Sequence, residues 1–255
     1  MIALKLVLTP LLVGFISLAG RKWGSRVSGW LIGLPLTSAP VTLFLAYEQG
    51  TTFAAKVAQG ILFGLISQTL FCVAYSWLSF RWSWLACWLS GWGLFFIATL
   101  CFEQINVPYP LAFVSVNTAI IIGLLILPKP KGAVVEAKAP AWEIAARMLI
   151  ATGLVLTLTT AAPALGSQLS GLLSPLPVYA TIFAIFTQRF QSQEATLLVL
   201  RGVLVSSFAC AVFFLVVILA IQNWGILAAF LVATLAAIVT QGAALRLSRP
   251  SLSIK

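Results

Sequence analysis

The chain consists of long apolar runs separated by short polar segments. A helix needs about 20 predominantly apolar residues to cross a bilayer, and nine runs reach that length. They predict membrane-spanning helices at roughly 2–20, 27–47, 54–79, 82–101, 107–127, 143–162, 168–188, 196–221 and 224–243. The pattern therefore predicts an all-α polytopic membrane protein of about nine transmembrane helices.

Two of these runs, 27–47 and 168–188, contain helix breakers. The first includes SGWLIGLPLTSAP (residues 28–40) and the second includes SGLLSPLPV (residues 170–178). Proline costs about 3 kcal/mol inside a helix, because it lacks a backbone N–H and clashes with the preceding turn. The two stretches align so that Pro35 corresponds to Pro177, which suggests that the break is duplicated.

The same alignment extends along the chain at a constant offset of 142 residues. About 22 of the first 100 positions are identical under this shift, whereas this composition gives about nine by chance. The first and sixth predicted helices are then equivalent but five crossings apart, an odd number, so the copies lie in opposite orientations. We therefore predict a four-helix repeat A at 1–105, a connector helix with a cytoplasmic loop at 106–141, an inverted four-helix repeat B at 142–246 and a cytoplasmic tail at 247–255.

The basic residues indicate which side faces the cytoplasm. With nine crossings, 13 Lys and Arg residues fall on one side, and only Lys5 and Lys56 fall on the other. Because basic loops are retained in the cytoplasm, we expect the N-terminus outside and the C-terminus inside the bacterial inner membrane. If 27–47 and 168–188 were re-entrant hairpins, the two sides would carry 9 and 6, so full crossing is favoured.

Composition excludes several kinds of chemistry. Charged residues make up only 8% of the chain, and His and Asp are absent. This rules out a Ser-His-Asp triad, a His-based metal site and an Asp that would hold Mg²⁺. No G-x-x-x-x-G-K-[ST] loop for ATP is present. We therefore expect no enzymatic activity, no cofactor and no bound metal.

The cysteines and the net charge of +10 have simpler explanations. The four cysteines lie in apolar runs without a C-x-x-C pair, as expected for small apolar residues rather than disulfides or metal ligands. The basic residues sit singly or in small groups between apolar runs, which is typical of membrane loops, and so we expect no nucleic-acid partner. The short basic loop at 129–138 is suited to anionic lipid headgroups.

The breaker segments are the candidate functional site, and two interpretations of them remain open. They serve either as kinks and small-residue packing faces, or as broken helices whose freed carbonyls and hydroxyls line a polar cavity. For Pro35 the freed carbonyl belongs to Leu31, and for Pro177 it belongs to Leu173. The hydroxyl of Ser170 also lies nearby. The candidate substrate-lining residues are Gly33, Pro35, Thr37, Ser38, Thr42, Ser174, Pro177, Tyr179 and Thr181.

The ionisable residues lie away from the predicted membrane centre. Glu48 ends the second predicted helix at the outer face, and it is a candidate for an outer-vestibule acid that collects protons or cations; the alternative is a solvated loop acid. Trp residues occupy predicted interfaces, as an aromatic belt requires: Trp23, Trp82, Trp142 and Trp224. Without a central charge, a neutral, amphipathic or lipid-like substrate is favoured over a strongly charged one.

The breaker segments also carry a resemblance. SGWLIGLPLTSAPVTLFLAYEQG and SGLLSPLPVYATIFAIFTQ resemble segments of uncharacterised bacterial multi-pass inner-membrane proteins, and they are similar to the small GlpM-like membrane proteins, which have a comparable Gly/Pro break in the second helix. The resemblance covers about 20 residues in each half. It implies a membrane-embedded helical fold and no particular functional residues.

Inverted-topology repeats are typical of secondary transporters, which bind substrate near the midplane where the repeats meet. We therefore expect a secondary transporter or permease that alternates access between the repeats. The alternative is a non-transport membrane protein, such as an accessory subunit or a lipid-interacting scaffold. The expected partners are the lipid bilayer and a small-molecule substrate, and the sequence does not indicate an oligomeric state.

Overall fold

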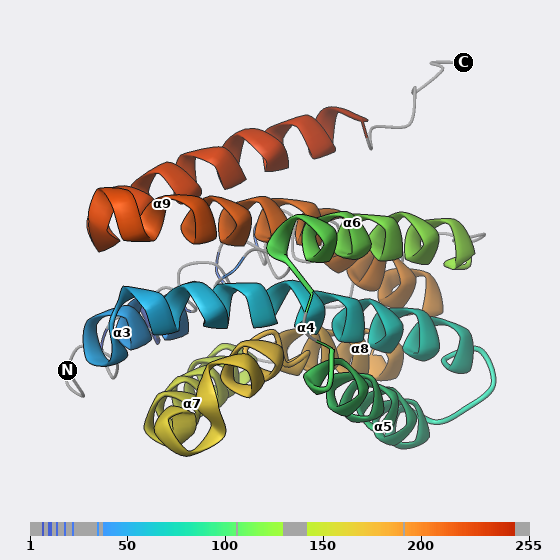
Figure 1. Cartoon of the computed structure of the whole chain (residues 1–255). Helices are drawn as coiled ribbons and strands as arrows, with labels where there is room; N and C mark the ends of the chain where they lie inside the picture. The colour runs from blue at the N-terminus through green and yellow to red at the C-terminus, as the bar shows by residue number, and fades with distance from the viewer. Residues whose placement is uncertain are drawn as a thin grey trace.

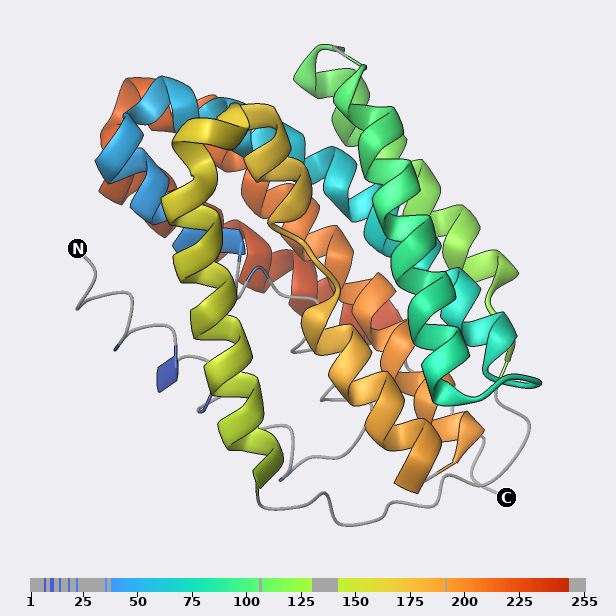
Figure 2. The same ribbon diagram turned by 90° about the horizontal axis from the view of Figure 1, so that it is seen from below.

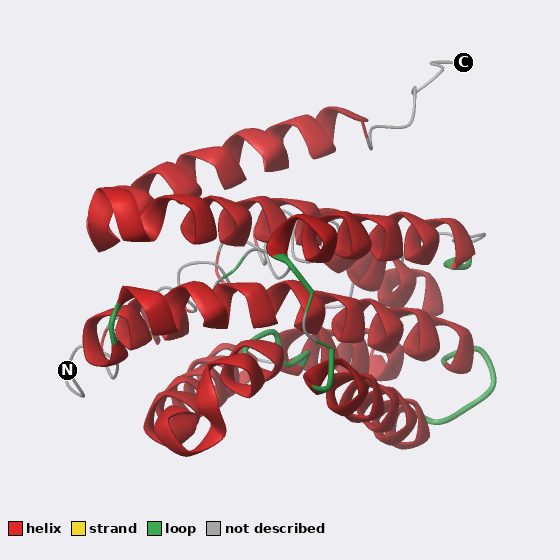
Figure 3. Ribbon diagram, in the orientation of Figure 1, coloured by secondary structure: helices red, strands yellow, loops and turns green. Residues whose placement is uncertain are grey.

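The computed structural model describes four long ranges of the chain, 38–105, 107–129, 142–190 and 192–247, and isolated positions before Ser38. Throughout these ranges the ordered elements are helices and no strand is present (Figure 3). The predicted all-α fold class is therefore confirmed. The predicted helix at 2–20, the start of the one at 27–47, the loop at 130–141 and the tail at 248–255 lie outside the described residues.

Seven helices follow one another along the described ranges (Figure 1). They are α3 (Ser38–Gln49), α4 (Thr51–Leu78), α5 (Trp84–Glu103), α6 (Tyr109–Ile126), α7 (Trp142–Leu173), α8 (Val178–Phe190) and α9 (Gln193–Leu247).

Three glycines make sharp junctions between helices. Gly50 joins α3 to α4 with φ 90° and ψ 166°. Gly166 divides α7 at φ 75° and ψ 171°, and Gly225 divides α9 at φ 77° and ψ 172°. Glycine is essentially the only residue that adopts this backbone region, because a Cβ atom would clash. Each junction therefore reverses the chain with a single residue in place of a loop.

The described part of the chain contains four helices that are long and apolar enough to cross a membrane: α4, α5, α6 and α9. The prediction of nine such helices is corrected accordingly. The 55-residue α9 contains two predicted helices, 196–221 and 224–243, which the chain joins at Gly225 without a loop. With 12 and 13 residues, α3 and α8 are shorter than the roughly 20 that a crossing needs.

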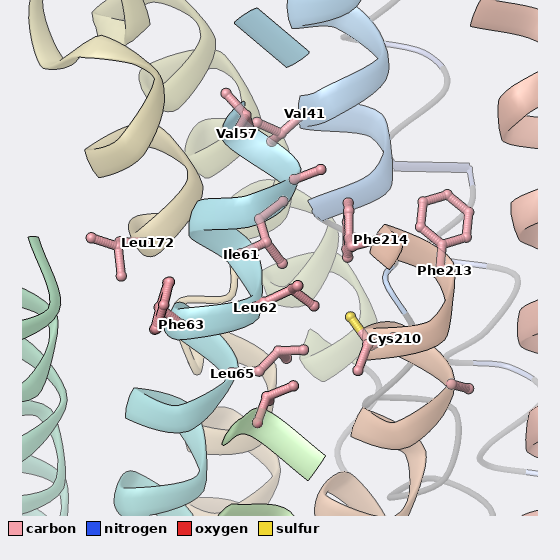
Figure 4. Close-up of a cluster of buried hydrophobic side chains, with 14 of the residues drawn as sticks. Val41, Val57, Ile61, Leu62, Phe63, Leu65, Leu172, Cys210, Phe213 and Phe214 are labelled. Carbon is pink, nitrogen blue, oxygen red and sulfur yellow. The ribbon is translucent and has the colours of Figure 1, made fainter. Parts of the chain in front are cut away.

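The uninterrupted helix α4 lies at the centre of the bundle and packs against α3, α5, α6, α7 and α9 (Figures 1 and 2). Of its most apolar stretch, 72% is buried inside the protein, compared with 28% for α5 and 22% for α6. Ile61, Leu62 and Leu65 of α4 share one buried cluster with Cys210 and Phe214 of α9 (Figure 4). The core of the fold is thus the contact of α4 with its neighbours.

The outer surface of the bundle is apolar. Large apolar side chains that are more than half exposed occur on α5, α6 and the last part of α9, among them Leu89, Ile97, Leu100, Leu111, Leu125, Leu227, Leu235 and Val239. An apolar surface of this extent is suited to lipid rather than to water. Together with the helix lengths, it indicates a membrane-embedded protein.

The helix connections gather at two opposite ends of the bundle (Figure 2). The α4–α5 turn and the α8–α9 turn lie at one end, where the side-chain amide of Gln193 donates to the carbonyl of Ser79 at 2.6 Å. The α3–α4 junction and the sharp bend within α7 lie at the other end. The long helices therefore run from one end of the bundle to the other.

Candidate functional site

The helix predicted at 168–188 is broken rather than kinked. α7 ends at Leu173, α8 begins at Val178, and residues 174–177 join them through a turn and a bend. Two of these four residues are prolines, which cannot donate to the helical hydrogen-bond ladder. The interruption therefore follows from the sequence of the segment itself.

The backbone of the break forms short local hydrogen bonds. The N–H of Ser174 donates to the carbonyl of Ser170 at 3.1 Å, and the N–H of Leu176 donates to the carbonyl of Leu173 at 3.1 Å. The N–H of Val178 donates to the carbonyl of Leu176 at 2.7 Å. The Leu173 carbonyl, which Pro177 was predicted to free, thus finds a partner inside the break.

The far end of α8 is attached to the turn between α4 and α5. Nε2 of Gln188 donates to the carbonyl of Trp82 at 3.1 Å, and its Oε1 accepts from the hydroxyl of Tyr75 at 2.8 Å. One amide therefore uses both its donor and its acceptor to fix α8 against this turn. Breaking such contacts leaves polar groups without partners in an apolar setting, which is costly.

The broken segment, residues 167–190, is attached at its first residues to the C-terminal end of α5. Nε2 of Gln168 lies 2.8 Å from the carbonyl of Glu103, and 3.3 Å from each of the carbonyls of Phe102 and Ile105. Carbonyls at a helix C-terminus lack partners within the helix. Gln168 of α7 therefore supplies a side-chain cap for α5.

A third contact joins the middle of α5 to α8. Nε1 of Trp92 donates to Oγ1 of Thr181 at 2.8 Å. Gln188, Thr181 and Gln168 thus meet the start, the middle and the end of α5, so the broken segment runs antiparallel to α5 along its length. The 20 residues of α5 span about 30 Å, which is the thickness of the hydrocarbon layer. The break lies within about two turns of Thr181 and therefore near mid-depth.

On the side facing α4, the broken segment is packed backbone to backbone. A Cβ atom on Gly60 of α4 would lie 2.6 Å from the carbonyl oxygen of Gln168 and 3.0 Å from Cα of Gly171. A Cβ atom on Gly64 would lie 2.5 Å from the carbonyl oxygen of Leu172. Small residues permit such close approach between membrane helices. The break therefore has a tightly packed face toward α4 and a hydrogen-bonded face toward α5.

Three predicted lining residues lie in or near this break. Ser174 is fully buried, and its hydroxyl donates to the carbonyl of Ser170 at 2.8 Å. Pro177 is buried directly before α8, and Thr181 lies one turn into it. The side chain of Tyr179 lies outside the described residues.

The lining residues predicted in the first half of the chain lie on or before α3. Ser38 and Thr42 are buried, and the hydroxyl of Thr42 donates to the carbonyl of Ser38 at 2.8 Å. Pro35 lies in a bend before α3, whereas Gly33 and Thr37 lie outside the described residues. α3 packs against α7, so this group approaches the broken segment from its α7 side.

The other predicted candidates lie away from the break. Glu48 is exposed at the end of α3, next to the Gly50 junction, and its vestibule role stays a prediction. All four cysteines are free, and Cys101 is exposed while the other three are buried. Among the described residues, no group of three His, Cys, Asp or Glu side chains could hold a metal ion.

The residues that brace the break were not among the predicted lining residues. Gln168 and Gln188 lie 20 positions apart, one on each side of the prolines. Two amides so placed in an apolar run are a sequence signal that could have identified them. Ser170 is fully buried, and its Oγ has no hydrogen-bond partner. A buried hydroxyl without a partner is uncommon and requires a structural or functional explanation.

The comparisons with known proteins identify no relative. The predicted likeness to GlpM-like proteins rests on the two breaker segments alone and stays a prediction. The search of family models, of curated proteins and of solved structures found no match for this chain.

Proposed function

We propose that this protein is a secondary transporter or permease for a small neutral, amphipathic or lipid-like solute. The observation that carries the proposal is the interruption of a bundle-length crossing near its middle. Secondary transporters bind substrate at such breaks, because an unwound segment offers polar groups at mid-depth. One turn before the break, the buried Oγ of Ser170 has no hydrogen-bond partner and could meet a solute there. No charged residue occurs between 168 and 188, which favours a neutral solute.

We propose further that the chain is built from two inverted repeats. The helix starts support this: α4 begins at Thr51 and α9 begins at Gln193, which is 142 positions later. α5 begins directly after Ser83, and the second part of α9 begins directly after Gly225, again 142 positions later.

Local contacts and packing add to this support. The N–H of Ala39 donates to the carbonyl of Pro35 at 2.8 Å, and at the equivalent place the N–H of Thr181 donates to the carbonyl of Pro177 at 2.7 Å. α3 packs against α4 as α8 packs against α9. α4 and the first part of α9 lie side by side and run in opposite directions, as inverted copies would (Figures 1 and 2).

The proposed orientation places the α4–α5 and α8–α9 turns in the cytoplasm. Arg81 and Arg189 lie at that end of the bundle, together with Lys129 after α6, whereas Lys56 lies near the start of α4. Basic residues concentrate on the cytoplasmic side of inner-membrane proteins. The protein would then lie in the bacterial inner membrane with its N-terminus outside and its C-terminus inside.

The two glutamines suggest how access would alternate. Gln188 joins the proposed repeats at the inner end of the broken crossing, and Gln168 joins them at the outer end. With both contacts formed, Ser174 at the break is fully buried. Release of the Gln168 contacts would open a path from outside, and release of the Gln188 contacts would open one from inside. The close backbone contact between Gly60 and Gly171 would act as the surface along which the repeats slide.

The second candidate is a scaffold or accessory subunit without transport activity. The specific observation that favours it is the backbone packing of Gly60, Gly64 and Gly171, which is tight enough for a static helix interface. A scaffold predicts no solute flux and co-purification with a partner protein.

Flux measurements on purified protein in liposomes separate the two candidates. The probes are radiolabelled glycerol, alanine, glucose and uridine, with a fluorescent phospholipid for lipid translocation. Pro177→Ala should reduce the flux of the transported probe at least tenfold. Pro163→Ala, which changes an exposed proline in the same α7, serves as the matched control and should leave it unchanged. If Pro177→Ala and Pro163→Ala give equal flux, the break has no role in transport. If no probe is transported at all, the scaffold is favoured.

A further inference from the structure

A cavity of about 920 Å³ opens at the end of the bundle that carries the α4–α5 turn. It lies where α4 and α6 end and α9 begins, far from the break in the middle of the bundle. Its walls are formed by Trp77, Leu78, Phe80, Arg81, Trp82, Pro128, Lys129, Glu194 and Leu197. This volume is within the range of small-molecule sites, which runs from roughly 300 to 1,000 Å³.

The aromatic residues of the cavity indicate its depth in the membrane. Trp77, Phe80 and Trp82 are exposed by 54%, 46% and 50% respectively. Trp side chains that are half covered and half exposed at a helix end are typical of the interface, where their rings lie at the level of the headgroups. The cavity therefore opens at headgroup level and is bordered by apolar rings on the hydrocarbon side.

The charged residues of the cavity are predominantly basic. Arg81 and Lys129 contribute two positive charges, and Glu194 contributes one negative charge. Glu194 lies in the first turn of α9, where the positive end of the helix dipole stabilises a carboxylate. Its charge is thereby partly offset, and the two cations remain to attract an anion.

The position of Arg81 is fixed by the backbone of the α4–α5 turn. The N–H groups of Arg81 and Trp82 donate to the carbonyl of Leu78 at 3.0 and 2.9 Å. Gln188 and Gln193 hold the same turn through its carbonyls. The guanidinium is therefore carried by a hydrogen-bonded turn, and a guanidinium matches the geometry of two phosphate oxygens.

We propose that this cavity binds the headgroup of an anionic glycerophospholipid from the cytoplasmic leaflet. The phosphodiester lies between Arg81 and Lys129, and the acyl chains lie along Trp77 and Phe80 toward the hydrocarbon. Basic pockets between transmembrane helices on the cytoplasmic side bind lipid headgroups in this manner. One water occupies about 30 Å³, and a phosphate is only a few times larger. A free phosphate would therefore fill only a small part of the cavity, and a lipid is the better match. The cavity lies at the end of the bundle rather than at the break, and the proposal does not require transport.

Native mass spectrometry of the full chain in mild detergent tests the proposal. The probes are dioleoylphosphatidylglycerol, dioleoylphosphatidylcholine and inorganic phosphate, each added separately. The expected result is one tightly held phosphatidylglycerol per protein and weaker retention of phosphatidylcholine. Arg81→Gln combined with Lys129→Gln should weaken retention of phosphatidylglycerol about thirtyfold. Each basic residue near an anionic lipid contributes about 1 kcal/mol, which is slightly more than fivefold in affinity, and the two effects multiply.

Two further variants keep the result interpretable. Lys56→Gln removes an exposed cation from the opposite part of α4 and should leave lipid retention unchanged. Arg81→Lys keeps the charge, and its loss of retention should be smaller than that of the double variant. A single symmetric peak in size-exclusion chromatography confirms that each variant is folded. Equal retention of phosphatidylcholine, unchanged retention in the double variant, or displacement of the lipid by millimolar phosphate would each overturn the proposal.

Discussion

Substitution of Gly171 by alanine tests the packing of the broken crossing against α4. In the structure, a Cβ atom at this position overlaps the carbonyl oxygen of Val57 and lies 2.8 Å from Cα of Gly60 and 3.0 Å from the backbone nitrogen of Ile61. All three neighbours are backbone atoms of α4, so a change of side-chain rotamer cannot relieve the overlap. The two helices must separate instead.

The size of the effect follows from these distances. Carbon atoms in ordinary contact lie about 3.5–4.0 Å apart, so α7 and α4 would have to separate by roughly 1 Å. Forcing extra atoms into a packed site costs about 1–3 kcal/mol, and the higher end applies where backbone must move. Alanine recovers up to about 1 kcal/mol through its helix propensity. We therefore expect Gly171→Ala to lower the free energy of unfolding by about 2 kcal/mol.

The assay is reversible unfolding of the purified protein in mixed dodecyl maltoside and sodium dodecyl sulfate micelles, followed by circular dichroism. Gly153→Ala is the matched control, because it lies in the same α7 with no atom within 4 Å of the added Cβ. The control should be unchanged or stabilised by up to about 1 kcal/mol. If Gly171→Ala is as stable as Gly153→Ala, the close contact with α4 does not exist as described.

Three further substitutions test single features of the fold by the same unfolding measurement. Gln188→Ala removes the amide that joins α8 to the α4–α5 turn and should cost about 1–3 kcal/mol; wild-type stability would show that this contact is not formed. Trp92→Phe keeps the ring and removes the donor to Thr181, so a loss of about 1 kcal/mol is expected, and a double-mutant cycle with Thr181→Val should give no additional loss. Gly225→Ala introduces a Cβ into open space at φ 77°, so a cost of order 1–3 kcal/mol would come from the backbone alone; no cost would argue against the sharp junction in α9.

Hydropathy located most of the helices because membrane helices must bury their backbone in continuous apolar segments. The predicted runs at 54–79, 82–101 and 107–127 correspond closely to α4, α5 and α6. Hydropathy separated the runs at 196–221 and 224–243, but it did not show that a single residue joins them without a loop. Gly225 reverses the chain inside such a run, and the adjacent Trp224 was interpreted only as an interfacial residue.

The position of the break was predictable, and its surroundings were not. Pro175 and Pro177, two positions apart in one crossing, cannot both be accommodated in a regular helix, so the interruption after Leu173 follows from local chemistry. The partners of Gln168 and Gln188 are carbonyls of the α4–α5 turn and of the end of α5, more than 60 residues away in the sequence. Only the folded bundle shows which carbonyls lack helical partners there. The cavity that Arg81 and Lys129 line likewise depends on helix ends that meet in space.

The most direct test of the central claim is the accessibility of the break from each side of the membrane. Ser174→Cys is introduced into a variant in which Cys72, Cys87, Cys101 and Cys210 are replaced by alanine, and sealed vesicles are treated with a membrane-impermeant thiol reagent. Ser83→Cys, exposed in the α4–α5 turn, is the control and should react from one side only. Alternating access predicts that the cysteine at position 174 reacts slowly from both sides, because its site is fully buried when both glutamine contacts are formed. If the cysteine reacts from neither side, the result contradicts alternating access and indicates a static helix interface.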